Sequence, residues 1–114
     1  MLEDLDHEIR QFEAEISQNH NVDDPLEAYD QYIRWAKERL PSTTFLELLE
    51  QSIRTFKDDA GYKSDPRYFN MWLLFAARVF EPNAIFAYML AHDIGTVFSK
   101  FYQTYAESLE SAGL

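Results

Sequence analysis

Hydrophobic residues at the start of the chain recur every three or four positions, the spacing that places side chains on one face of a helix. The first such stripe is Leu2, Leu5, Ile9, Phe12 and Ile16, and the residues between them are mostly charged or polar. We predict an acidic amphipathic helix over residues 1–20. It packs its stripe on the rest of the domain, and a heptad-like seam to another chain is the alternative.

Two further helices are expected from start signals and from stripes of the same spacing. Asp24 before Pro25 favours a helix start, because aspartate caps free N–H groups and proline suits the first turn; Pro41 then ends the helix. Its apolar face is Leu26, Tyr29, Tyr32, Ile33, Trp35, Ala36 and Leu40. Thr44 with Glu47 has capping-box spacing and predicts the start of a third helix. The inward face of that helix is Phe45, Leu48, Leu49, Ile53 and Phe56.

The next segment predicts a fourth and a fifth helix. Asp65-Pro66 repeats the first start signal. The run YFNMWLLFAARVF that follows is apolar around most of its circumference, so we expect a central helix that is buried from two sides. Glu81-Pro82 begins a short fifth helix, after which Gly95 offers a left-handed turn. The apolar residues of the fifth helix are Ile85, Phe86, Tyr88, Met89 and Leu90.

The sixth predicted helix covers residues 97–111 and stops at Gly113. Its inward face is expected to comprise Phe98, Phe101, Tyr102, Tyr105 and Leu109. This helix is similar to the first helix of a tetratricopeptide repeat (TPR), with Gly113 at the turn of the repeat. We therefore expect a truncated last repeat, a natural protein that continues beyond it, and an unshielded apolar strip at the C-terminal end.

An aromatic residue followed three places later by a second aromatic and then by alanine occurs three times. The copies are Tyr32, Trp35 and Ala36; Trp72, Phe75 and Ala76; and Tyr102, Tyr105 and Ala106. Each copy places two rings beside a flat position where a neighbouring helix can approach closely. The lags of 40 and 30 residues predict an all-α, irregular TPR-like solenoid of about six antiparallel helices arranged as hairpins. Residues 21–114 are expected to form this repeat domain, as one structural unit with residues 1–20.

Charge and candidate chemistry point to protein binding. The net charge is −10, and residues 1–30 hold ten acidic residues against Arg10, so neither nucleic acid nor an anionic membrane is expected as a partner. The acidic face is either solvated or a docking face for a basic segment. The sequence has no cysteine, scattered histidines and no glycine-rich loop. We therefore predict no catalytic residue, no metal site and no cofactor.

Five short motifs follow one another along the sequence. They are Asp24, Pro25 and Leu26; Tyr32, Ile33 and Trp35; Tyr62, Asp65 and Arg67; Ile94 and Gly95; and Phe101, Tyr102, Tyr105 and Ala106. These motifs lie in the strings DDPLEAYDQYIRWAKERLPS, YKSDPRYFNMWLLFA and HDIGTVFSKFYQTYAESLESAG. Over residues 8–113 the chain resembles the N-terminal homology region of the Bub and BubR/Mad mitotic-checkpoint proteins.

The resemblance implies a TPR-like domain that binds a short amphipathic segment of the kinetochore scaffold Blinkin and helps to bring the checkpoint protein to unattached kinetochores. It also implies that this peptide lies on the fourth and fifth helices, at Trp72, Phe75, Arg78, Val79, Tyr88 and Met89. Core packing is the alternative role for the aromatic and methionine residues of this set. Arg78 stands where BubR-like members have an apolar residue, which leaves the identity of the peptide open, although its stem can still cover apolar surface.

Further partners and rival functions complete these expectations. Other checkpoint subunits and self-association through exposed terminal helices are expected, in the nucleus and at the kinetochore or centromere, with an additional cytoplasmic pool. The Bub kinase and BubR/Mad branches both stay open; in the former the full-length protein carries a C-terminal serine/threonine kinase domain. The rival readings are a half-TPR scaffold module of an RNA-processing or other assembly complex, and a regulatory arm that positions an attached kinase.

Overall fold

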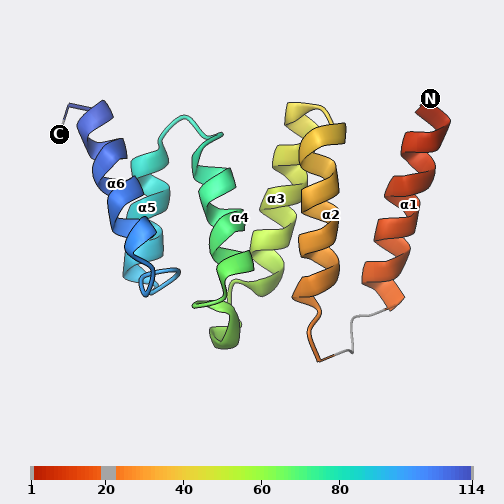
Figure 1. Cartoon of the computed structure of the whole chain (residues 1–114), viewed down its shortest axis with the longest axis horizontal. Coiled ribbons are helices and arrows are strands. Elements are labelled where there is room, and N and C mark those ends of the chain that lie inside the picture. The colour runs from red at the N-terminus through yellow and green to blue at the C-terminus, as the bar shows by residue number, and fades with distance from the viewer. Residues whose placement is uncertain (1, 19–22, 114) are drawn as a thin grey trace. The chain divides into compact units, whose positions relative to one another are not determined.

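The computed structural model describes residues 2–18 and 23–113, and the regular structure within them is helical (Figure 1). The elements in chain order are α1 (Leu2–Gln18), α2 (Leu26–Arg39), α3 (Ser42–Phe56), the 3₁₀ helix η1 (Ala60–Tyr62), α4 (Pro66–Ala76), α5 (Pro82–Ala91) and α6 (Ser99–Ser111). The predicted all-α fold of about six helices is confirmed. The chain divides within α3 into two compact units, residues 1–48 and 49–114, and the predicted grouping of residues 1–20 with 21–114 stays a prediction.

In the first unit, α1 and α2 run antiparallel and pack through aromatic rings (Figure 1). The Phe12 ring stacks in parallel on the Tyr32 ring, with 5.0 Å between their centroids, and lies 5.1 Å from the Trp35 ring. Burial raises the pKa of the Tyr32 hydroxyl, and the nearby Glu13 carboxylate raises it further. The predicted stripe of α1 is half-buried at Leu5, Ile9, Phe12 and Ile16, while the side chain of Leu2 lies outside the described part.

The structure supports the predicted start of α2 and corrects the predicted start of α3. The backbone of Pro25 is already helical, with φ −65° and ψ −20°, and α2 begins one residue later, close to the predicted start. The predicted start of α3 at Thr44 is wrong, because the helix begins at Ser42 and the Phe45 N–H donates to the Pro41 carbonyl at 2.9 Å. Thr44 therefore lies inside the first turn and cannot cap it. All five residues predicted to face inward from α3 are buried.

In the second unit, α4 starts as predicted but ends early. The Asp65 carboxylate accepts a hydrogen bond from the Arg67 backbone N–H at 2.8 Å, and a proline follows at the first helical position. The helix ends at Ala76, four residues before the predicted end at Phe80. Pro82, which restricts only Glu81 before it, begins the next helix six residues after Ala76. Phe80, between the two helices, is 98% exposed.

The central helix α4 is buried from two sides, as predicted. Its buried residues are Tyr68, Phe69, Met71, Trp72 and Ala76. On one side the Tyr68 hydroxyl donates to the Ile53 carbonyl of α3 at 2.8 Å, and burial raises the pKa of this hydroxyl to about 12. On the other side Trp72 stacks on Tyr88 of α5. Part of α4 stays open, because Leu73, Leu74 and Phe75 are only half-buried.

The left-handed residue that closes α5 is Asp93, with φ +58°, and the Ile94 N–H donates to the Met89 carbonyl at 2.9 Å, so the predicted closure by Gly95 is wrong. Gly95 is left-handed as well, two residues later, and fixes the turn between α5 and α6 against α4. Its φ of +73° lies in the left-handed region, and a Cβ atom there would lie 2.2 Å from Cδ1 of Phe69. The Gly95 N–H donates to the Lys63 carbonyl at 2.8 Å. Only glycine therefore allows the turn to approach Phe69 so closely.

The last helix, α6, packs on α5 and differs from prediction at one aromatic residue. Phe101 is buried, whereas Phe98, Tyr105 and Leu109 are half-buried. The predicted inward position of Tyr102 is wrong: its side chain is 51% exposed, and its hydroxyl donates to the Thr96 carbonyl at 3.0 Å. Neighbouring residues on a helix point about 100° apart, so Phe101 and Tyr102 cannot both face α5.

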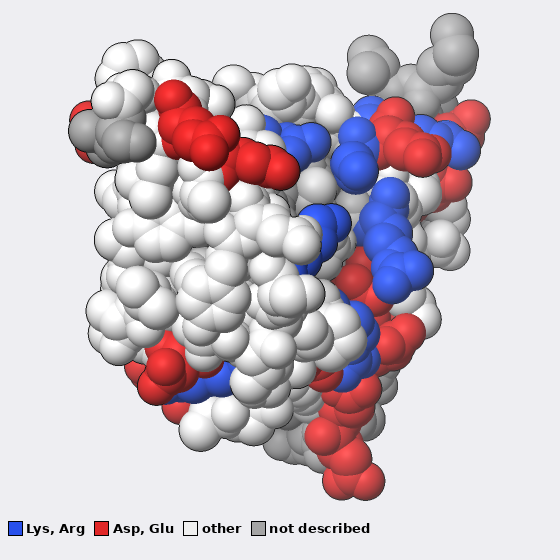
Figure 2. All heavy atoms as spheres, turned by 60° about the vertical axis from the view of Figure 1, so that its left-hand side comes forward, with Lys and Arg blue, Asp and Glu red and all other residues white. Residues whose placement is uncertain are grey.

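The face on which α5 and α6 lie is turned towards the viewer in Figure 2, and most of it is uncharged. The large hydrophobic residues exposed in the described part of the chain are Phe80 before α5, Leu90 in α5, Val97 before α6 and Tyr102 in α6. The expected apolar strip at the C-terminal end, and self-association through it, stay predictions.

Candidate peptide-binding groove

In the second unit, the C-terminal part of α3 together with α4 and α5 lines an open groove with a volume of about 320 Å³. Its apolar lining is Ile53 from α3, Trp72 and Phe75 from α4, and Ala84, Ile85 and Tyr88 from α5. Its charged lining is Glu50, Arg54 and Lys57, all from α3 or the residue that follows it. The groove thus combines an apolar floor with a charged rim on one side, which is the form of a site for an amphipathic helix.

The floor of the groove is a stack of aromatic rings. Trp72 and Tyr88 stack with 5.4 Å between centroids and an interplanar angle of 17°. Behind them, Trp72 meets Tyr68 edge-on, and Tyr88 lies 4.1 Å from the His92 ring. Rings packed in this way lose little further freedom on binding, so the floor is preorganised.

Trp72 serves as the base of this floor more than as its contact surface. It is 4% exposed, and its indole nitrogen is buried without a hydrogen-bond partner. The neighbouring indole lowers the pKa of the Tyr68 hydroxyl, against the larger effect of burial, which raises it. The exposed contact area of the floor therefore comes from Phe75, Ile85 and Tyr88, which are half-buried.

The rim contains an ion pair that a ligand can rearrange. Arg54 donates to the Glu50 carboxylate at 2.5 Å, one helical turn away, and the two side chains are 74% and 45% exposed. Exposed pairs of this kind contribute at most about 1 kcal/mol, because water screens them and both side chains lose freedom. Lys57 lies three residues beyond Arg54 and lines the groove as well, so two cations flank it.

The structure brings together some of the residues predicted to bind a peptide and separates others. Trp72, Phe75 and Tyr88 all line the groove. Met89 has no exposed surface, so it supports the site from within the core and cannot touch a docked segment. Arg78 and Val79 follow the end of α4 outside the groove lining.

Arg78 has a local structural role at the end of α4. Its guanidinium donates to the Leu74 carbonyl at 3.0 Å, one of the carbonyls that the last turn of a helix leaves unpaired. The side chain is exposed, as a contact to an acidic partner would require. Its predicted role in peptide binding stays a prediction.

Sequence reasoning missed the contribution of α3 to the groove. Ile53 was recognised only as part of a buried stripe, and Arg54 and Lys57 were not singled out. The spacing of hydrophobic residues shows which face of α3 is buried, but not which helix lies opposite. No local signal in the sequence identifies the charged rim.

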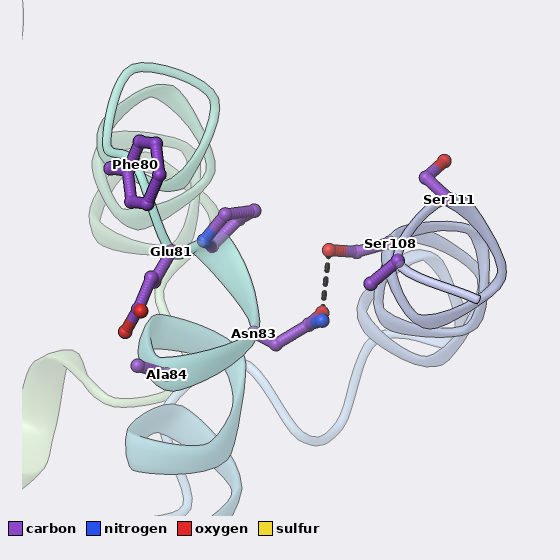
Figure 3. A pocket seen from close by; sticks show the side chains of 8 residues that line it. Phe80, Glu81, Asn83, Ala84, Ser108 and Ser111 are labelled. Atoms are coloured by element: carbon purple, nitrogen blue, oxygen red, sulfur yellow. Dashed lines mark hydrogen bonds between the residues drawn. The ribbon is translucent and has the colours of Figure 1, made fainter. Parts of the chain in front are cut away.

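A second cavity, of about 430 Å³, lies between the start of α5 and the end of α6 (Figure 3). Its lining is Phe80, Glu81, Pro82, Asn83, Ala84, Ser108, Ser111 and Ala112. The Ser108 hydroxyl donates to the Asn83 side-chain oxygen at 2.6 Å and ties the two helices together. Half of the lining residues of this cavity are charged or polar, whereas six of the nine residues that line the peptide-binding groove are apolar or aromatic, so the cavity is the weaker candidate.

The described residues contain no group of three or more histidine, cysteine or acidic side chains arranged to hold a metal ion. None of their helices combines the length and apolar character needed to cross a membrane. The described part of the chain is thus helical, and its second unit has a preformed apolar groove.

The matching family model names the class of this domain. Residues 7–114 match the model of Mad3/BUB1 homology region 1, and the chain belongs to that family. The family resemblance inferred from the sequence motifs is therefore confirmed.

The relatives include fungal, animal and plant proteins. The chain is 34% identical over 107 residues to the mitotic spindle checkpoint component mad3 of Schizosaccharomyces pombe, covering 90% of this chain and 34% of that protein. It is 32% identical over 111 residues to the mitotic checkpoint serine/threonine-protein kinase BUB1 beta of Homo sapiens, covering 94% of this chain and 10% of that protein. The chain thus spans about a third and a tenth of the lengths of these relatives.

A chain in the crystal structure of a mitotic checkpoint complex has the same fold. The TM-score is 0.91 at 32% sequence identity, and the match covers 99% of this chain and 55% of that chain.

Proposed function

We propose that this chain is a non-catalytic interaction domain of a spindle-checkpoint protein, and that its groove binds a short amphipathic helix of a Blinkin-type kinetochore scaffold. Membership of the Mad3/BUB1 family supports the checkpoint role, since the relatives are named as mitotic checkpoint proteins. The preformed aromatic groove is the observation that carries the binding role. It offers apolar area on two helices beside a charged rim, as helix-binding grooves do.

Within this proposal the predicted residues have different tasks. Phe75 and Tyr88 contact the docked helix, while Trp72 and Met89 support them from below. Arg78 and Val79, beyond the end of α4, meet a part of the scaffold segment that extends past the groove.

The proposal also places the protein in the cell and among other subunits. Binding to the scaffold localises it to kinetochores in the nucleus, with an additional cytoplasmic pool. Similarity to a chain from a mitotic checkpoint complex supports contacts with further checkpoint subunits. The family match favours this role over that of a half-TPR module in RNA processing, and the regulatory-arm hypothesis stays a prediction.

Isothermal titration with peptides that tile the kinetochore scaffold of the source organism tests the proposal. We expect one or more peptides to bind, and Phe75→Ala or Tyr88→Ala to weaken binding by about tenfold, because truncation of a buried aromatic contact typically costs more than 1 kcal/mol. Phe80→Ala is the matched control, because Phe80 is also aromatic but lies outside the groove. Unchanged affinity in both groove variants, at unchanged helicity, would remove the groove from the binding site.

A further inference from the structure

The charge of the groove differs in sign from the charge of the chain as a whole. The chain carries a net charge of −10, which by itself favours basic ligands. Among the residues that line the groove, however, Arg54 and Lys57 stand against Glu50 alone, so the lining carries a net positive charge. Asp58 and Asp59 follow Lys57 in the chain but lie outside the lining. A docked side chain contacts the lining, so the charges of the lining act on it at the shortest range.

The two cations are near neighbours in the chain. Arg54 lies in the last turn of α3 and Lys57 one residue beyond the helix, and both side chains line the same groove, three residues apart in the chain. Carboxylates at positions i and i+3 or i+4 of a docked helix have the same spacing and can reach both cations together. The Arg54 guanidinium can exchange Glu50 for such a carboxylate at little cost, because their pair is exposed.

From this arrangement we infer that the segment which occupies the groove is an amphipathic helix with an acidic flank. Its apolar face meets Phe75, Ile85 and Tyr88, and its carboxylates pair with Arg54 and Lys57. The inference rests on the proposed function, since it assigns the chemistry of the helix that this same groove binds. Charge at the rim then selects the partner and fixes its direction, while apolar burial supplies most of the affinity.

Two designed helical peptides of about 18 residues, or five turns, test this inference without any knowledge of the natural ligand. Both carry the same apolar face and the same helicity, and they differ only in having glutamate or lysine along one flank. We expect the glutamate peptide to bind about fivefold more tightly, in the range of one or two partly exposed ion pairs. The difference should shrink at high salt.

Charge reversal on the protein gives the matched pair of variants. Lys57→Glu should remove or invert the preference for the glutamate peptide. Lys100→Glu changes the net charge by the same amount at an exposed site on α6 outside the groove, and should leave the preference within about twofold. Thermal melting followed by circular dichroism checks that both variants stay folded.

The outcomes separate the inference from the proposed function. Equal or tighter binding of the lysine peptide, an equal effect of the two charge reversals, or no binding of either peptide overturns the acidic flank. If scaffold peptides still bind and respond to Phe75→Ala, the proposed function survives that result. If no scaffold peptide binds while the glutamate peptide does so through Lys57, the acidic-helix site stands and its assignment to the scaffold fails.

Discussion

The second and third copies of the aromatic, aromatic, alanine pattern have the same spacing but different surroundings. In α4, Trp72 and Ala76 are buried and Phe75 borders the groove. In α6, Phe101 takes the inward position instead, Tyr102 and Ala106 are exposed, and Tyr105 is half-buried against Phe86 of α5. The pattern therefore marks a helix with two large rings, but does not determine which ring is buried.

The difference comes from the neighbours of each helix. Within residues 49–114, α4 contacts α3 through Tyr68 and α5 through Trp72, whereas α6 packs on α5. A helix with partners on two sides buries a wide arc, and its pattern residues fall within that arc. A helix with a partner on one side buries a narrow stripe, and the same pattern is left partly outside it.

Replacing the first aromatic residue of each copy by alanine should give the largest difference in stability between the α4 and α6 variants. Trp72→Ala removes a buried ring from the stack with Tyr88 and Tyr68, and we expect it to lower the free energy of unfolding by about 4 kcal/mol. Tyr102→Ala removes an exposed ring with one surface hydrogen bond, and should cost less than about 1 kcal/mol.

Urea denaturation of both variants measures this difference. Similar losses of stability would show that Tyr102 is buried in solution and that the two copies have equivalent surroundings. Equal slopes of the two denaturation curves are needed for the comparison, since the slope reports the surface exposed on unfolding.

Substitution at Gly95, in the turn between α5 and α6 that lies against α4, should have the next largest effect on stability. Gly95→Ala places a Cβ atom against the Phe69 ring and adds a side chain at positive φ, so we expect a loss of about 3 kcal/mol. Gly113→Ala has the same backbone strain, with φ +79°, but no atom within 4 Å of the new Cβ. It should cost only about 1 kcal/mol.

The difference between the two glycine variants isolates the contact with Phe69. Thermal unfolding of both proteins measures it, and the double variant Gly95→Ala with Phe69→Ala provides a further control. If Gly95→Ala were no more harmful than Gly113→Ala, the close approach of the turn to α4 would be wrong.

Local sequence signals predicted the helices well where the signal acts within a few residues. The Asp65 cap, the stripes of α1 and α3 and the left-handed Gly95 all depend on backbone chemistry or helical spacing, and the structure has them. The prediction for the start of α3 was wrong, because Thr44 and Glu47 form a capping box only in a helix that begins at Thr44. Pro41 instead accepts the first helical hydrogen bond.

The groove could be predicted only in part, because it depends on which helices meet. Family resemblance pointed to Trp72, Phe75 and Tyr88, and these residues do line it. The same resemblance named Met89, which the structure places wholly in the core. The α3 rim had no signal of its own, since surface arginine and lysine on a helix are usually solvated.

Substitutions at the starts of α4 and α6 should have the smallest effect on the free energy of unfolding. α4 begins with the Asp65 carboxylate, which accepts from the Arg67 N–H and also pairs with the Arg67 guanidinium at 2.8 Å. α6 begins after Phe98, which forms no side-chain cap and instead stacks on Phe69 at 4.8 Å. The start of α4 therefore depends on hydrogen bonds, and that of α6 on ring packing.

Asp65→Ala should lower the free energy of unfolding by about 1 kcal/mol, the usual effect of losing a helix cap. Asp65→Asn keeps an oxygen that can cap the helix but removes the ion pair with Arg67, so its cost should be about half as large, because ion pairs near the surface contribute little. Urea denaturation resolves the two variants. If asparagine were as harmful as alanine, the local ion pair with Arg67 and not the cap would hold the start of α4.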